Sequence, residues 1–131
     1  MERFLPILNT IQFRLRKILA ENMEGMLLWD SAKLKSVGDG LIRLSTDIYP
    51  QLSMVEHRVL YQSIREAGLG IRMRAMSIEG REINDEDKEY FRSVYEALLD
   101  ICQKIESGEY YRALLEIAEK RKGRKEESYT F

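Results

Sequence analysis

The sequence is poor in the residues that small metal or nucleophilic sites require. It contains one cysteine, Cys102, and one histidine, His57. A single cysteine cannot form a disulfide within the chain, which favours a reducing compartment such as the cytoplasm. One histidine and one cysteine cannot supply the nitrogen and sulfur ligands of a zinc site. We therefore expect no metal, no cofactor and no disulfide framework.

Long apolar runs and catalytic motifs are also missing. No stretch of about 18 uncharged apolar residues occurs, which argues against a membrane span. The first residues lack the basic start and small-residue cleavage site of a signal peptide. There is no glycine-rich phosphate loop, serine nucleophile elbow or zinc-ligand spacing. These absences predict a cytoplasmic protein that is not an enzyme.

Charge of one sign is not in excess either. The chain carries 21 Lys and Arg against 22 Asp and Glu, for a net charge of −1. Such a balance argues against binding nucleic acid through overall charge. Charged residues make up 33% of the chain, while asparagine, glutamine and threonine are scarce, a composition typical of thermophile proteins.

Apolar residues at helical spacing are abundant. Between residues 53 and 76 they recur every three or four positions, which predicts a helix with one core-facing stripe: Leu60, Ile64, Ala67, Ile71 and Ala75. Ser53 followed by Glu56 is the capping-box pattern for its start. Gly68 and Gly70 each cost about 1 kcal/mol relative to alanine inside a helix. They either allow close approach of another backbone or break the helix, and we favour a continuous helix.

Four further helices are expected, over residues 4–24, 26–48, 84–107 and 109–121. Gly25 either separates the first two or marks a bend, and residues 38–40 either lie within the second helix or split it. Asn84 is the expected cap of the fourth helix, which Ser107 and Gly108 end. No segment alternates like a strand. The prediction is an all-α, single-domain antiparallel bundle of four to five helices with a long central helix, spanning residues 1–119, followed by a charged flexible tail over residues 120–131.

The predicted central helix has a second apolar line. Leu69, Met73 and Met76 lie on the side away from the first stripe, interleaved with arginines. A helix that is apolar on two sides is either central or covered by a partner. We therefore predict self-association or docking to another protein, with Leu69, Met73 and Met76 at the contact and Arg65 and Arg72 at its polar rim.

The arginines of this helix suggest an alternative. Arg58, Arg65 and Arg72 repeat every seven residues, with Arg74 nearby, and such a ladder can contact phosphates. The alternative function is a small nucleic-acid-associated accessory subunit. Glu66 on the same helix and the balanced net charge favour an ordinary solvated or ion-paired face.

The remaining polar candidates have simpler explanations. His57 lies at the margin of the core stripe and lacks a partner that would orient it as a base. Cys102 lies on or beside an apolar stripe, as a buried small side chain would. Acidic residues around the start of the fourth helix complement its dipole better than they match a cation site: Glu82, Asp85, Glu86, Asp87 and Glu89.

Overall fold

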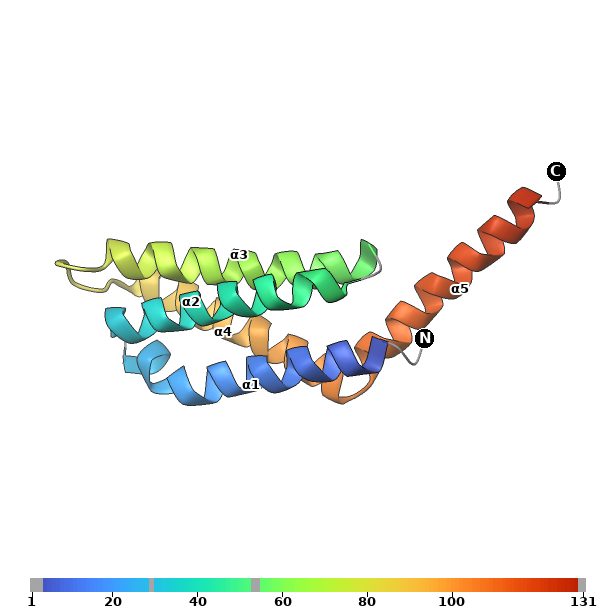
Figure 1. The fold of residues 1–131 in the computed structure, drawn as a ribbon. Helices are drawn as coiled ribbons and strands as arrows, with labels where there is room; N and C mark the ends of the chain where they lie inside the picture. The colour runs from blue at the N-terminus through green and yellow to red at the C-terminus, as the bar shows by residue number, and fades with distance from the viewer. Residues whose placement is uncertain (1–3, 29, 53–54, 130–131) are drawn as a thin grey trace.

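The computed structural model describes residues 4–28, 30–52 and 55–129, with the side chains of residues 6–21, 30–52, 58–117, 119 and 120. This part of the chain forms five α-helices and contains no strand (Figure 1). The helices are α1 (Phe4–Leu28), α2 (Ser31–Ile48), α3 (Val55–Ser77), α4 (Asp85–Glu106) and α5 (Glu109–Tyr129), with a short 3-10 turn, η1 (Tyr49–Gln51), between α2 and α3. The predicted all-α fold is confirmed.

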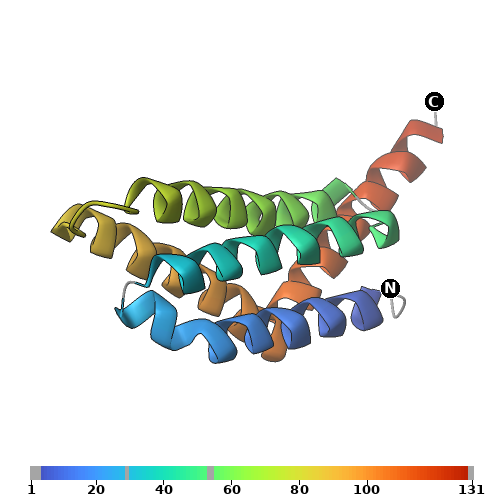
Figure 2. The same ribbon diagram turned by 60° about the vertical axis from the view of Figure 1, so that its left-hand side comes forward.

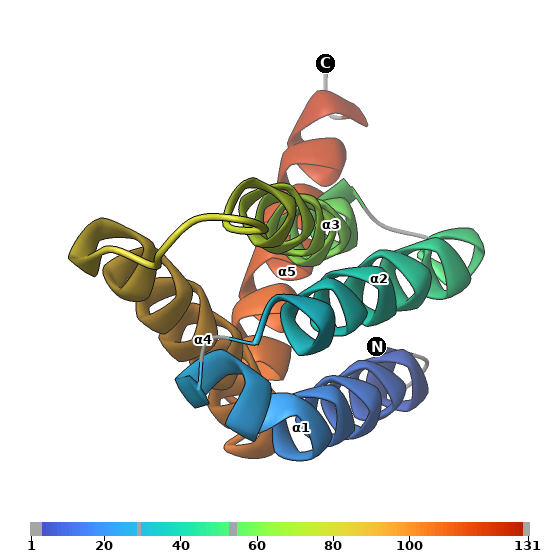
Figure 3. The same ribbon diagram turned by 90° about the vertical axis from the view of Figure 1, so that its left-hand side faces the viewer.

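Helices α1 to α4 run alternately in opposite directions and form the four corners of a bundle (Figures 2 and 3). Helix α1 packs beside α2 and α4, and α3 packs beside the same two helices at the diagonal corner. Helix α3 is long, at 23 residues, and α1 is comparable at 25. The start of α5 contacts α1 and α4, and its second half projects away from the bundle (Figure 1).

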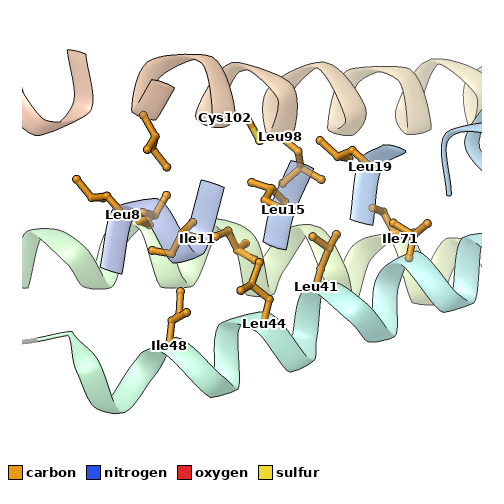
Figure 4. Packing of buried hydrophobic residues seen from close by; sticks show 14 of the residues in the cluster. Leu8, Ile11, Leu15, Leu19, Leu41, Leu44, Ile48, Ile71, Leu98 and Cys102 are labelled. Carbon is orange, nitrogen blue, oxygen red and sulfur yellow. The ribbon is translucent and has the colours of Figure 1, made fainter. Parts of the chain in front are cut away.

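The core lies between these four helices and is built from the stripes that the sequence predicts (Figure 4). Each apolar stripe turns inward because burying it removes apolar area from water, at about 25 cal/mol per Å². The fully or almost fully buried side chains include Leu8, Ile11 and Leu15 of α1, Leu34, Val37, Leu41, Leu44 and Ile48 of α2, Leu60, Ile64, Ile71 and Ala75 of α3, and Phe91, Leu98 and Cys102 of α4.

Two predicted helix signals are confirmed. Asn84 caps α4 by accepting a hydrogen bond from the backbone N–H of Asp87, whose carboxylate accepts from the Asn84 N–H in return. At the other end, Ser107 is the C-cap, and Gly108 follows with φ of +80°. Glycine adopts that left-handed conformation without a Cβ clash, so α5 can leave α4 in a new direction.

The boundary between the first two helices is a correction. Residues 26–28 belong to α1, which continues through Gly25, and α2 begins only at Ser31. The cause is the Asp30 side chain, which accepts hydrogen bonds from the backbone N–H groups of Ala32 and Lys33 at 2.9 and 3.2 Å. An aspartate cap of this kind satisfies two donors that the first turn leaves open.

The open questions about glycine are resolved in favour of unbroken helices. Helix α2 runs through residues 38–40, and α3 runs through Gly68 and Gly70. The capping pair expected at Ser53 and Glu56 is not tested, because Ser53 and the side chain of Glu56 lie outside the described part of the chain. Helix α5 continues to Tyr129, through residues expected as a flexible tail, so no change of secondary structure marks the proposed boundary at residue 120.

Candidate functional site

The second apolar line of α3 faces away from the bundle. The exposed fractions are 40% for Leu69, 71% for Met73 and 53% for Met76. The sequence left two ways to cover this line, a central position in the fold or a partner. All three side chains are exposed, so the bundle itself does not cover this line. We call these three residues the exposed apolar line.

The two flanks of α3 are occupied by other helices. Towards α2, a Cβ added to Gly68 would lie 2.9 Å from the carbonyl oxygen of Gly38 and 3.0 Å from the backbone nitrogen of Ile42. Towards α4, the Tyr90 hydroxyl lies too close to Gly70 for a Cβ to fit there. The glycines therefore let α2 and Tyr90 approach α3 closely, which leaves the exposed apolar line as its outward side.

The four arginines predicted as phosphate contacts form two pairs with different surroundings. Arg72 forms an ion pair with Asp39 of α2, with 3.4 Å between nitrogen and oxygen. Arg74 donates a hydrogen bond of 2.8 Å to Asp87 of α4, and its guanidinium lies 4.6 Å from the centre of the Tyr90 ring. Both charges are therefore engaged by neighbouring helices, and Arg74 in particular serves the α3–α4 contact.

Arg58 and Arg65 are placed differently. They line a hollow of about 400 Å³ formed by residues of η1 and α3. The other lining residues are Tyr49, Tyr61, Gln62, Glu66 and Leu69. Among the described residues, neither Arg58 nor Arg65 has an ion-pair partner. We call this feature the tyrosine–arginine hollow; sequence periodicity could not reveal it, because Tyr49 comes from η1.

Asp87 holds together the loop between α3 and α4. Its side chain is only 1% exposed and accepts from Arg81 at 2.6 and 3.1 Å, from Arg74 at 2.8 Å and from the Asn84 backbone at 3.2 Å. The hydrogen bonds from Arg81 and then Arg74 hold the pKa of Asp87 well below its usual value. Asp87 therefore has a structural role beyond the dipole complementarity predicted from the sequence.

An apolar hollow at the junction of α3 and α5 was not predicted. It has a volume of about 230 Å³ and is lined by Val59, Tyr110, Ala113, Leu114 and Ile117. The signal was present in the spacing of the four α5 residues, which is that of one helical stripe. Of these four, Leu114 is buried and Ile117 is 38% exposed.

The side chain of His57 lies outside the described set, so its predicted boundary position stays a prediction. Cys102 is fully buried, and burial raises the pKa of its thiol. Within the described residues, no three side chains from histidine, cysteine, aspartate and glutamate come together as a metal ion would require.

The burial of Cys102 predicts slow thiol chemistry. At pH 8 we expect the native protein to react with a disulfide reagent on the order of 100-fold more slowly than the protein in denaturant, because only opened molecules expose a thiolate. Absorbance of the released thiol measures both rates. Similar rates in the two conditions would contradict the buried position.

No protein family, curated protein or solved structure was found to match this chain. Across the described helices, none combines the length and apolar character that crossing a membrane requires.

Proposed function

We propose that this protein acts without catalysis, as a helical bundle that self-associates through the outward side of α3. The observation that carries the proposal is the exposed apolar line, three large apolar side chains on one side of one helix. Water-exposed apolar residues that adjoin one another on a surface mark contact sites more often than isolated ones do. The two methionines also favour a contact site, because the flexible thioether side chain adapts to an opposing surface.

A second copy is the simplest partner for such a surface. A two-fold axis would bring the same line from each copy together, so that one set of residues supplies both halves of the contact. A stable interface buries about 800 Å² on each partner. Three side chains supply only its centre, so neighbouring polar residues must form the rim, and Arg65 and Arg72 lie beside the line to do so.

Replacing Met73 with glutamate tests the proposal. We expect the mass in solution to fall towards the 15.4 kDa of one chain, with the dissociation constant raised at least about tenfold, because a carboxylate loses its water shell in an apolar contact. Helical content should stay unchanged, since Met73 is exposed in the single chain. Light scattering over a concentration series measures the mass, and circular dichroism measures the helix.

Phe13→Glu is the matched control. Phe13 is 67% exposed and lies on α1, at the corner of the bundle diagonal to α3. The same charge introduced there should leave the association unchanged. A wild-type protein that remains monomeric at high concentration would contradict self-association, and a loss of association in the Phe13 variant alone would assign it to another surface.

A further inference from the structure

The tyrosine–arginine hollow combines two kinds of side chain that recognise different parts of one ligand. Tyr49 of η1 and Tyr61 of α3 bring their ring centres within 4.8 Å, at an angle of 50°. Tyr61 also packs against the core, which restrains its ring before any ligand arrives. The two rings therefore offer an aromatic surface, held on the Tyr61 side by the core, beside an open space of about 400 Å³.

The two arginines supply positive charge beside these rings. Arg58 and Arg65 are seven residues apart on α3, about two helical turns or 10 Å, and both line the hollow with Tyr61. Unlike Arg72 and Arg74, neither is paired with a carboxylate of the described residues. Guanidinium groups in this state can bind phosphate through paired, charge-assisted hydrogen bonds.

From this arrangement we propose that the hollow binds a phosphate ester that carries a flat ring, namely a nucleotide. The phosphate lies against Arg58 and Arg65, and the base lies on the tyrosine rings, where stacking contributes about 1–3 kcal/mol per base. Glu66 is the one carboxylate among the lining residues. Its charge opposes the phosphate and limits the affinity. The nucleotide is either free or part of a single strand, since both present the same two groups.

Calorimetric titration with adenosine monophosphate, adenosine, inorganic phosphate and a short single-stranded oligoadenylate tests the proposal. Adenosine and phosphate should each bind at least about tenfold more weakly than the monophosphate, because each lacks one of the two groups. Monophosphate binding assigns the hollow to free nucleotides. Binding of the oligoadenylate alone assigns it to a strand, and binding of neither overturns the proposal.

Variants locate the binding. Arg58→Ala and Tyr49→Leu should each weaken it about tenfold, through loss of the charge or the ring. Arg43→Ala is the matched control, because Arg43 is an exposed arginine of α2 that does not line the hollow. Glu66→Gln should strengthen binding several-fold, a gain that misfolding could not produce. Equal weakening by Arg43→Ala and Arg58→Ala would overturn the proposal, since it would indicate general attraction of charge.

This inference does not depend on self-association, although the hollow shares Leu69 and Arg65 with the contact proposed there. The variants chosen, at Arg58, Tyr49 and Glu66, avoid both shared residues. A variant that loses nucleotide binding but keeps its mass in solution therefore bears on the hollow alone. A variant that loses association but still binds nucleotide bears on the self-association alone.

Discussion

Gly38→Ala should lower the free energy of unfolding by about 1–2 kcal/mol, although alanine is the better helix former. A Cβ at this position would lie 2.8 Å from the carbonyl oxygen of Gly68 and 2.9 Å from the Cβ of Arg72. Neither group can swing aside like the end of a flexible side chain, so α2 and α3 must separate. Such overpacking costs about 1–3 kcal/mol, and the gain in helix propensity offsets up to about 1 kcal/mol of it.

Gly40→Ala is the matched control for the effect of Gly38→Ala on the contact between α2 and α3. The new Cβ would contact only the Ile18 side chain, at an ordinary distance of 3.6 Å. The helix gains propensity without strain, so the free energy of unfolding should rise by up to about 1 kcal/mol. Urea titrations of both variants and the wild type measure the differences in the free energy of unfolding, with one common dependence on urea concentration for all three proteins. If Gly38→Ala stabilised the protein as Gly40→Ala does, α2 and α3 could not be in backbone contact.

The close contact between α2 and α3 also shows which features could not be predicted from the sequence. The stripe through Leu60, Ile64 and Ile71 could be predicted, because helical periodicity is local and the core then buries it. For Gly68 the sequence allowed either close approach of another backbone or a break in the helix. Its partner could not be identified, because Gly38 is 30 positions away and no local pattern records which helices meet.

The same limit applies to the candidate site. The exposed apolar line was predicted from periodicity alone, and the structure leaves those residues exposed. Arg58, Arg65 and Arg72 were predicted as one ladder with Arg74 nearby, but the partners of each arginine come from other elements of the fold. Asp39 engages Arg72, and Asp87 engages Arg74, whereas Tyr49 lies with Arg58 and Arg65 around a hollow. Those neighbours follow only from the packing of the helices.

The other large effect is expected at Asp87. Asp87→Asn keeps the size of the side chain but removes the charge that binds Arg74 and Arg81, leaving two guanidinium groups against a neutral amide. Loss of a buried ionic partner is among the most damaging single changes. We expect the melting temperature at pH 7 to fall by roughly 10 °C. Asp85→Asn is the control, because Asp85 is an exposed residue in the first turn of α4 and should shift the melting temperature by only about 1–2 °C.

The pH dependence of the free energy of unfolding distinguishes the contribution of the Asp87 charge from that of its shape. Arg81 and Arg74 lower its pKa in the folded protein, while in the unfolded chain the pKa is near its ordinary value of about 3.9. The unfolded state therefore takes up the proton first as pH falls, so the stabilisation by Asp87 is complete above about pH 4 and is lost as the pH approaches the lowered pKa. Urea titrations between about pH 7 and pH 2 should show the wild type losing its advantage over Asp87→Asn across that acidic window. A constant gap between the two proteins down to the lowest pH would mean that the ion pairs with Arg74 and Arg81 do not stabilise the fold, and that Asp87 acts only as the polar partner of Asn84.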